Sequence, residues 1–392
     1  MEYIRIGALC VNNAEQQHIA ENDMIDYVDI SSIDNERKCI TSFESIRFAD
    51  APSRARKLVR NNDIIVSTVR PNLNAVALCK IDTPHQLVVS TGFCVLSCKP
   101  GINYEYLFHF CQSNRFIDSL IKQATGASYP AVNDKIIRDV TLPNYSLSEQ
   151  NKISMQLSAL QQIIHDRKQQ LKAFNTLIKA RFVDMFGDPF AGSSFEIKKL
   201  MDVSISIADG SNIEKAYYAN KGDVLFLRIQ NIWFNEFKLD DSVFISDEIN
   251  HHYYETSLHH GDLLITKIGR YYTPDSSLGR VAVYLGEDNK ANYSNNIMRI
   301  RLINGIHSEF VNALMNLENY NKYIRMVSVG GTDKRALSKA IVGNLPIIVP
   351  PYDLQILFVN FVHQIEKSKA IIQRSIEKTQ LLYDSLMQEY FG

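Results

Sequence analysis

The chain has 392 residues, which is enough for two or three domains that each bury a core of their own. Its apolar fraction of 45% and charged fraction of 22% are ordinary for a globular protein, and no apolar run approaches the roughly 18 residues that a membrane span needs. A net charge of −1 excludes a uniformly basic, histone-like DNA binder and equally an acidic DNA mimic. Any nucleic-acid site must therefore depend on local positive charge.

The cysteines indicate a reducing compartment and no metal. All of them lie in the first 111 residues: Cys10, Cys39, Cys79, Cys94, Cys98 and Cys111. Cys94 and Cys98 are four positions apart, but no CxxC pair or nearby histidine completes a zinc set. We expect free, mostly buried thiols, no cofactor and, because MEYIRIGALC lacks a signal-peptide pattern, a cytoplasmic protein.

The elements along the chain suggest two mixed helix and strand regions. β-branched residues and alternation predict strands at residues 63–69 and 87–90 in the first half, and at 262–268 and 280–284 in the second. A helical stretch follows in each half, near residues 104–123 and 309–326. Each stretch ends in a turn of small residues, Thr125-Gly126-Ala127-Ser128 or Gly330-Gly331-Thr332.

A repeat of about 205 residues organises the whole chain. Both halves finish in a long polar–apolar segment that ends in an aromatic residue and a glycine, Phe186-Gly187 and Phe391-Gly392. Before each segment a strand-like run stops at proline, at Pro143 in the first half and at Pro350-Pro351 in the second. Ser146 or Ser148 can cap the first helix and Asp353 the second.

A heptad seam runs back from these ends in both halves. In the first half the apolar seam positions are Ile153, Leu157, Leu160, Ile164, Leu171, Phe174 and Ile178. In the second half they are Phe358, Val362, Ile365, Ile372, Ile376, Tyr383 and Leu386. A heptad held over more than four repeats favours two helices that wind together over the alternative of one amphipathic surface helix in each half. The polar interruptions do not coincide, since Arg167 corresponds to Ile372 and Lys369 to Ile164, and such offsets fix register.

These patterns predict an α/β (α+β) protein with two similar globular domains, separated by two long helices that form an antiparallel coiled coil. We expect the first domain at residues 1–145, a central helix at 146–191, the second domain at 192–347 and a C-terminal helix at 348–392. The seam from Ile153 to Met185 would rise about 50 Å, at about 1.5 Å per residue. B-DNA repeats every 34–36 Å or so, and a rod of this length can hold two DNA readers about a turn or more apart.

The chain resembles the specificity subunits of type I restriction–modification systems over nearly its whole length. The resemblance rests on the strand-leading acids in Asn62-Asp63-Ile64-Ile65 and Gly261-Asp262-Leu263-Leu264, on the Thr-Gly-Ala-Ser turn, and on the helix start in which Pro143 precedes Glu149-Gln150. The second copy keeps the prolines but has no Glu-Gln pair at the matching place. The resemblance implies a non-catalytic subunit whose two target-recognition domains read the unlike halves of a split DNA sequence. It also implies docking of methyltransferase (modification) subunits, two in number, and of a restriction (motor-nuclease) subunit.

Clusters of basic and amide side chains are the candidate DNA contacts. Arg, Asn and Gln can pair with base edges, whereas Lys and backbone amides more often hold phosphate. In the first domain the candidates are Arg47, Arg54, Arg56, Lys57, Arg70, Asn72, Asn74, Gly126 and Ser128. In the second domain they are Lys267, Arg270, Tyr271, Tyr272, Arg280, Gly331, Lys334 and Arg335.

Two other functions fit parts of the sequence. Asp275, Asp288 and Lys290 loosely match the acidic pair and lysine of a metal-dependent endonuclease, a short and degenerate pattern. The long helices alone would suit a protein-binding coiled-coil scaffold. Val349-Pro350-Pro351-Tyr352 looks like an amino-methyltransferase motif but lacks its polar first residue, and no GxxxxGK[ST] phosphate loop is present.

Overall fold

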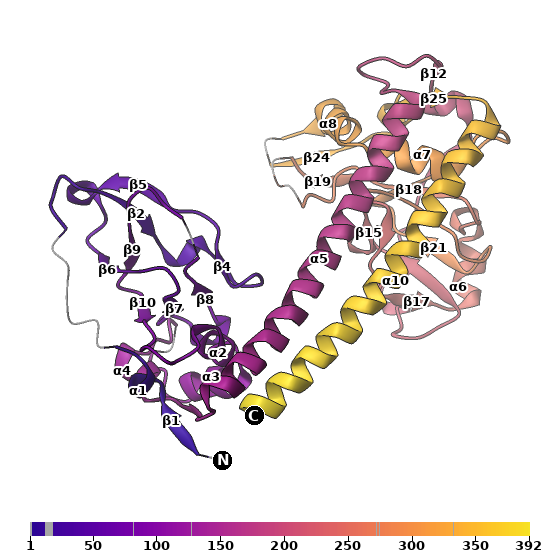
Figure 1. Ribbon diagram of the computed structural model, residues 1–392. Helices are drawn as coiled ribbons and strands as arrows, with labels where there is room; N and C mark the ends of the chain where they lie inside the picture. Colours follow the sequence, from indigo (N-terminus) through magenta and orange to yellow (C-terminus); the bar gives the residue numbers. More distant parts are fainter. Residues whose placement is uncertain are drawn as a thin grey trace. The chain divides into compact units, whose positions relative to one another are not determined.

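The computed structural model describes residues 2–11, 19–80, 82–126, 128–271, 273, 275–331 and 333–392. The chain folds as two compact units, the first formed by Met1–Gln169 with Ile372–Gly392 and the second by Gln170–Ile371. Two long helices, α5 (Leu147–Phe186) and α10 (Tyr352–Phe391), contribute to both (Figure 1). Each unit therefore contains one globule and part of each long helix.

The first unit contains a three-stranded sheet and a four-stranded sheet together with short helices. Its helices are α1 (Ile6–Leu9), α2 (Tyr104–Phe110), α3 (Asn114–Ile121) and α4 (Asp134–Asp139). Its strands are β1 (Tyr3–Arg5), β2 (Met24–Val28), β3 (Ile33–Asp34), β4 (Cys39–Ile40), β5 (Glu44–Arg47), β6 (Ala55–Leu58), β7 (Ile64–Ser67), β8 (Val76–Leu78), β9 (Gln86–Ser90), β10 (Phe93–Leu96) and β11 (Thr141–Pro143). They form sheets of order β10-β7-β8 and β5-β2-β9-β6, with the pairs β1-β11 and β3-β4.

The second unit has the helices α6 (Asp247–His252), α7 (Ser308–Met315), α8 (Glu318–Val327) and α9 (Lys339–Gly343). Its strands are β12 (Glu196–Lys199), β13 (Ser204–Asp209), β14 (Val224–Leu227), β15 (Ile232–Trp233), β16 (Glu236–Phe237), β17 (Val243–Ile245), β18 (Leu263–Thr266), β19 (Ile268–Arg270), β20 (Val281–Val283), β21 (Ala291–Tyr293), β22 (Ile297–Leu302), β23 (Val329–Gly330), β24 (Lys334–Ala336) and β25 (Pro346–Val349). The sheets have the orders β13-β22-β18-β20, β17-β14-β21 and β19-β24-β23, with the pairs β15-β16 and β12-β25.

The two units repeat the same strand pattern. In the first, β2 pairs parallel with β9 and antiparallel with β5; in the second, β14 pairs parallel with β21 and antiparallel with β17. The order β10-β7-β8 likewise recurs as β22-β18-β20. A mixed sheet needs a crossover between its parallel strands, so the same crossover in both units is strong evidence of a duplicated fold. The internal repeat in the sequence is thus a repeat in structure.

The strand-leading acids of the repeat close equivalent turns. The carboxylate of Asp63 accepts the backbone amide of Arg60 at 2.9 Å, and that of Asp262 accepts the amide of His259 at 2.7 Å. Both carboxylates are buried, and desolvation raises the pKa of Asp63. In the second unit Arg301 compensates this burial with two hydrogen bonds of 2.7 Å to Asp262.

Three expected elements are divided or shorter than the sequence suggested. The helical stretch 104–123 is two helices, because Ser113 adopts an extended conformation and its hydroxyl accepts the amide of Phe116 at 3.2 Å, which starts α3. The stretch 309–326 is also divided, between α7 and α8, where Leu317 is extended but makes no side-chain capping hydrogen bond. The strand expected at 262–268 ends at Thr266, and the chain then enters a different sheet as β19.

The starts of the long helices differ from each other. Ser146 caps α5 in a capping box, in which its hydroxyl accepts the amide of Glu149 and the Glu149 carboxylate accepts the amide of Ser146 at 2.9 Å. The Ser146 hydroxyl also donates to the Glu149 carboxylate at 2.7 Å, and this hydrogen bond, with that of the Ser146 amide, lowers the pKa of Glu149. Asp353, expected to cap α10, instead lies in its first turn, because the helix begins at Tyr352 directly after Pro351.

One glutamine in each helix holds the start of α5 or α10 to its globule. The Gln150 side chain accepts the amide of Asn103, the N-cap of α2, at 3.0 Å and donates to the carbonyl five residues before it at 2.8 Å. Gln355 accepts the amide of His307, the N-cap of α7, at 2.8 Å and donates to the carbonyl five residues before it at 2.9 Å. The second helix start therefore lacks the glutamate of the Glu-Gln pair, as its sequence shows, but its glutamine makes the same two hydrogen bonds.

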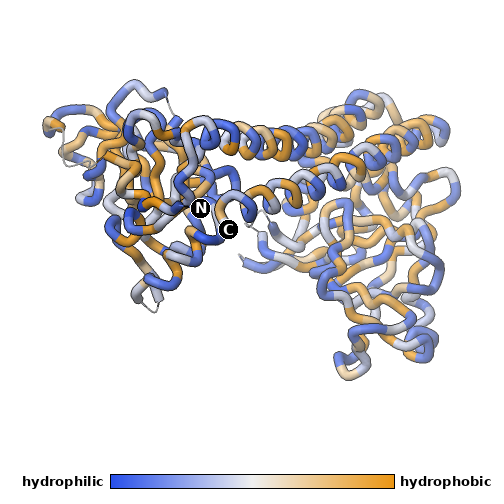
Figure 2. The backbone as a smooth tube through the Cα atoms, turned by 60° about the horizontal axis from the view of Figure 1, so that its bottom comes forward, coloured by the Kyte–Doolittle hydropathy of each residue, from blue (hydrophilic) through white to orange (hydrophobic). Residues whose placement is uncertain are grey.

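Within the first unit α5 and α10 run antiparallel. Gln156 meets Tyr390 at 2.8 Å, Gln161 donates to Tyr383 at 2.9 Å, and Arg167 donates to Thr379 at 2.7 Å. Later residues of α5 thus meet earlier residues of α10. In the second unit Phe182 and Phe186 of α5 pack on Phe358 of α10, with ring centroids 5.2 and 5.7 Å apart. Figure 2 shows polar and apolar segments alternating along both helices.

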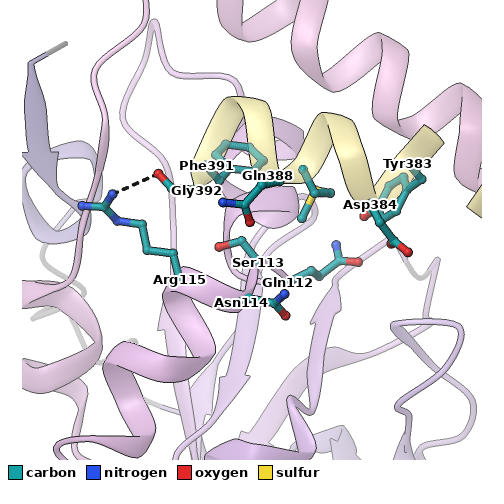
Figure 3. A pocket seen from close by; sticks show the side chains of 10 residues that line it. Gln112, Ser113, Asn114, Arg115, Tyr383, Asp384, Gln388, Phe391 and Gly392 are labelled. Carbon is teal, nitrogen blue, oxygen red and sulfur yellow. Dashed lines mark hydrogen bonds between the residues drawn. The ribbon is translucent and has the colours of Figure 1, made fainter. Parts of the chain in front are cut away.

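The helix ends are part of the globular cores. In the first unit Phe391 is fully buried against Tyr106 and Phe110, and Figure 3 shows the last turn of α10 above the start of α3. There Arg115 donates to the carbonyl of Gly392 at 3.4 Å beside a pocket of about 220 Å³. In the second unit Phe182 is fully buried against Phe310, so it needs no cover from a partner protein.

His109 of α2 is a buried histidine whose pKa is strongly lowered. Its ring is fully buried, its Nε2 lies 2.9 Å from the hydroxyl of Ser158 on α5, and no described residue bonds to its Nδ1. Desolvation lowers its pKa to about 4, against the weaker opposing effect of Glu105. A neutral imidazole therefore joins α2 to α5.

No helix among the described residues is long and apolar enough to cross a membrane. All six cysteines are free thiols.

Candidate nucleic-acid interface

A short, tightly held loop between β7 and β8 carries three of the expected DNA contacts. Arg70 and Asn74 both adopt the left-handed conformation, with φ of 51° and 46°, on either side of a single 3₁₀ turn, Pro71–Leu73. Arg70 and Asn72 are exposed, whereas Asn74 is buried. The structure brings Arg70 and Asn72 to the surface and gives Asn74 a different role.

Asn74 is an anchor for this loop. Its side-chain amide donates to the carbonyl of Cys111 at 2.9 Å, and its own carbonyl and side-chain oxygen both accept from Lys38, at 2.6 and 2.8 Å. Burial lowers the pKa of Lys38 to about 8. With its amide and oxygens in use inside the fold, Asn74 does not fit the expected base contact, and we remove it from the candidates.

Arg70 lies over an aromatic ring that the sequence analysis did not single out. Its guanidinium carbon is 4.7 Å from the ring centroid of Tyr129, whose side chain is 68% exposed. Tyr129 follows the turn at Gly126, where φ is +103° and a Cβ would lie 2.8 Å from the Tyr129 carbonyl oxygen. That turn requires glycine for its shape, and it places Tyr129 beside Arg70. The sequence signal that could have identified it is an aromatic residue three positions after the glycine of the small-residue turn.

The basic cluster that begins at Arg47 is mostly paired. Arg47 bonds to Asp50 and Arg54 to Asp29, each at 2.7 Å, and both arginines are more than half exposed. Arg56 donates to the carbonyl of Ser53 at 2.7 Å. Lys57 is largely enclosed and donates to Asp134 at 2.7 Å and to the carbonyl of Phe93 at 2.6 Å. These pairs reduce the local positive charge that the sequence alone suggested. Gly126 and Ser128 are exposed.

In the second unit the sheet β19-β24-β23 presents the corresponding cluster. Arg270 is exposed and lies 3.9 Å from Asp333, and Lys334 beside it is exposed as well. Tyr271 donates its amide to the carbonyl of Asp333 at 3.0 Å and stacks on Arg335, with 4.0 Å from the guanidinium carbon to the ring centroid. Gly331 is exposed; Tyr272 lies outside the described residues.

The stacked arginine of the second unit differs from that of the first. Arg335 is half-buried, and it donates to the carbonyl of Ser328 at 3.4 Å. Arg325 supports the same loop through hydrogen bonds to the carbonyls of Tyr271 and Thr273 at 3.3 and 3.2 Å. Arg335 therefore stabilises its loop through contacts within the fold, whereas Arg70 is exposed on the outer side of its loop.

Arg280 is the clearest departure from the expected contacts. It is 5% exposed, its guanidinium donates to the carbonyls of Asp275, Ser276 and Ile232, and it lies 3.8 Å from the ring centroid of Trp233. Desolvation lowers its pKa. Arg280 is a structural residue, and we remove it from the candidates. Lys267 is also mostly enclosed, and it donates to Asp209.

The residues of the suggested nuclease pattern have other partners. Asp288 accepts the amide of His260 at 2.7 Å, and Lys290 lies 3.7 Å from Asp247. Across the described ranges, no group of three or more His, Cys, Asp or Glu side chains could hold a metal ion.

The seam positions lie where the two long helices face each other or their globules. None of the apolar seam residues named from the sequence is exposed: Ile153, Leu157, Leu160, Ile164, Leu171, Phe174, Ile178, Phe358, Val362, Ile365, Ile372, Ile376, Tyr383 and Leu386. Other apolar side chains of the helices are exposed. In the first unit they are Leu147, Met155, Ile163, Leu381 and Leu382, and in the second Leu177, Val183, Leu357 and Ile371.

A groove of about 1340 Å³ lies within the second unit, between the helices and the globule. Its helix side is formed by α5 and α10, including Ile178, Lys179 and Glu366, and its globule side includes Phe237 and Leu285. Apolar surface with a charged rim is typical of protein interfaces.

Comparison with known proteins places this fold in a family. Residues 12–173 and 192–380 match the family described as "Type I restriction modification DNA specificity domain". A relative, the type I restriction enzyme MjaIX specificity subunit of Methanocaldococcus jannaschii, is 24% identical over 185 residues. That match covers 43% of this chain and 42% of the relative, so this chain spans less than half of that protein's length.

Two solved structures share the fold over the full chain. One, described as the structural basis of complex assembly and conformational transition of the type I R-M system, is 23% identical with a TM-score of 0.62 and covers 100% of this chain and 97% of its own. The other, the type-I restriction-modification system S subunit from M. genitalium, is 12% identical with a TM-score of 0.56 and covers 100% and 96%. Since the family match includes both units and more than half of the sequence, the chain belongs to the type I restriction–modification DNA specificity family.

Proposed function

We propose that the chain is the specificity subunit of a type I restriction–modification complex and reads a split DNA sequence whose two halves differ. The observation that carries the proposal is the repetition of one mixed-sheet fold in two units that present different side chains. The first unit offers Arg70 and Asn72, and the second offers Arg270 and Lys334. In this role the chain recognises DNA and catalyses nothing itself.

Local charge supports DNA as the ligand. The exposed guanidinium groups lie on loops and a small sheet rather than on a uniformly basic face, as a chain with a net charge of −1 requires. Such clusters contact base edges in the groove, while the paired arginines near residue 50 can exchange their carboxylate partners for phosphate. We do not propose the endonuclease, because no group of three or more His, Cys, Asp or Glu side chains among the described residues could hold a metal ion. We do not propose a scaffold alone, because the DNA specificity domain matches both units.

We further propose that α5 and α10 fix the spacing of the two half-sites. Each helix has 40 residues and would rise about 60 Å. Neither contains an interior proline, and antiparallel pairing stiffens both. A stiff spacer makes the gap of the recognised sequence a constant of the protein.

The exposed apolar residues of the helices support docking of the modification subunits, which we propose to be two, one for each unit. Met155 and Leu381 in the first unit are 67% and 70% exposed, and Ile371 in the second is 67% exposed. Large apolar side chains at helical spacing are the usual anchors of a helix-in-groove interface. The restriction subunit would join this assembly. We place the complex in the cytoplasm, where the six free thiols of the chain remain reduced.

The test is the methylation pattern of a host that carries the complete system. We expect methylated adenines in one split motif with unlike halves, and no such motif when only this chain is omitted. Absence of the motif, with all subunits shown to be expressed, contradicts the proposal. In vitro, a mobility shift of the chain with its methyltransferase should weaken steeply as salt rises, because phosphate contacts release counterions.

A further inference from the structure

The loop at Arg70 maintains a conformation that an arginine rarely adopts. Arg70 has φ of 51° and ψ of 62°, and the left-handed region costs a side chain such as arginine free energy that glycine would avoid. Such residues persist where the surrounding structure holds them, and they concentrate at ligand-binding positions. At an exposed loop tip glycine would relieve this strain, so the arginine side chain has a role that the backbone alone does not explain.

The surroundings of Arg70 hold the loop in one conformation. The Arg70 amide donates to the carbonyl of Pro130 at 2.7 Å, and the next residue, Pro71, is buried. At the other end Asn74 is fixed by Cys111 and Lys38, as described above. Both ends of the loop are thus tied to the folded globule, and Arg70 starts from a rigid base.

The guanidinium of Arg70 is positioned but not used within the fold. It lies over the exposed ring of Tyr129, and no described residue forms a hydrogen bond or ion pair with it. By contrast, Arg47 and Arg54 are paired with carboxylates, and Arg335, the stacked arginine of the second unit, donates to a carbonyl. A stacked guanidinium keeps its edge, with its donors in one plane, directed away from the ring face.

Taking the proposed function as its premise, we propose that Arg70 reads a guanine in the half-site of the first unit, with Tyr129 as its positioning residue. A planar fork of donors matches the O6 and N7 acceptors that guanine presents in the major groove, and this is the commonest specific arginine contact. A phosphate can also accept this fork, but lysine binds phosphate as a point charge, so a phosphate contact would need neither the strained backbone nor the stack.

The experiment compares methylated motifs of the complete complex with variants in the first unit. Arg70→Gly removes the side chain and tolerates the left-handed backbone, and Arg70→Lys keeps the charge but not the fork. Both should lose the guanine requirement at one position of one half-site, lowering discrimination there about 10-fold or more, while the other half-site is unchanged. Tyr129→Ala should relax the same position, and Tyr129→Phe, which keeps the ring, should not.

Arg5→Ala is the matched control, because Arg5 is an exposed arginine of the same unit that is paired with Asp139 and is not a candidate DNA contact. It should leave every base preference as it is. Binding measured against rising salt separates the two roles of Arg70. Uniform weakening on all sequences, with a salt slope smaller by about one, identifies a phosphate contact and overturns the inference. An Arg70→Gly complex with an unchanged motif overturns it too. If the unaltered complex methylates no split motif, the proposed function itself fails.

Discussion

Acid should loosen the first unit through His109. The ring is fully buried, and its pKa is lowered to about 4 from a usual value of 6.5. Between these two values the unfolded chain binds a proton that the folded unit excludes, so stability is complete above pH 6.5 and is lost as pH falls toward 4. The loss amounts to about 2 kcal/mol at pH 5 and about 3 kcal/mol at pH 4.

The groups that face His109 do not offset this loss. Glu105, one turn earlier on α2, raises the pKa only partly, and it is already paired with Lys80 at 2.8 Å. Ser158 of α5 is neutral, and Tyr383 of α10, with its ring 6.5 Å away, has a pKa that burial raises further above neutrality. Protonation therefore places an uncompensated charge between α2 and the long helices.

Amide hydrogen exchange at α2 and α5 measures the effect. At each pH the protein is compared with His109→Gln, which stays neutral and can still bond to Ser158, so that intrinsic exchange rates cancel. The free energy of opening should fall by about 2 kcal/mol more in the unaltered protein than in the variant between pH 7.5 and 5. Helix α7 of the second unit serves as an internal reference. An equal fall in both proteins would refute the reasoning.

Three further perturbations test the structure. Arg301→Ala leaves the buried Asp262 carboxylate without its arginine and should lower the free energy of unfolding of the second unit by about 3–5 kcal/mol, as measured by urea unfolding with the fluorescence of Trp233. A double variant that also replaces Asp262 with Ala should recover part of this stability, and no recovery would contradict the pairing. Gln150→Ala should reduce exchange protection at α2 by about 2–4 kcal/mol and Gln355→Ala should do so at α7; loss in both units from either variant would argue against two separate anchors. Removing one heptad from the middle of α5 and its counterpart from α10 shortens each helix by about 10.5 Å, which is equivalent to about 3 base pairs. The gap in the methylated motif should therefore shrink by about 3 base pairs, and an unchanged gap rules out the spacing role.

The long helices could be predicted from sequence because their evidence is periodic and repeated. The seam from Ile153 to Ile178 places an enclosed residue at nearly every turn of the helix. A second copy in the same phase favours paired helices over separate surface helices. The breaks within the shorter helical stretches could not be predicted, because they depend on single capping events such as that of Ser113. Asp353 shows the opposite error, since α10 begins at Tyr352, directly after Pro351, and this good capping residue lies inside its first turn.

The candidate interface was harder to predict because exposure and pairing are tertiary properties. Arg280 and Arg70 are both arginines beside turns, yet one is enclosed by carbonyls and Trp233 and the other lies outside on Tyr129. Likewise, Asn74 has the side chain of a base contact, but its oxygen accepts from Lys38 and its amide donates to the Cys111 carbonyl, so neither is available to DNA. Sequence identifies the residue types that could bind DNA; the fold decides which of them remain available.

The division of the chain into units affects the order in which the protein can be completed. Ile372–Gly392 belongs to the first unit, although the ribosome makes it after the second unit, and Phe391 packs beside Tyr106 and Phe110. Residues 170–371 must be synthesised in between, which takes about 10–40 s at about 5–20 residues per second. The second unit is continuous in sequence and can fold first. Until α10 is made, the apolar site for Phe391 in the globule of the first unit stays open. A nascent chain stalled or cleaved before α10 would leave that site uncovered, so quality control can detect an unfinished subunit by its N-terminal half.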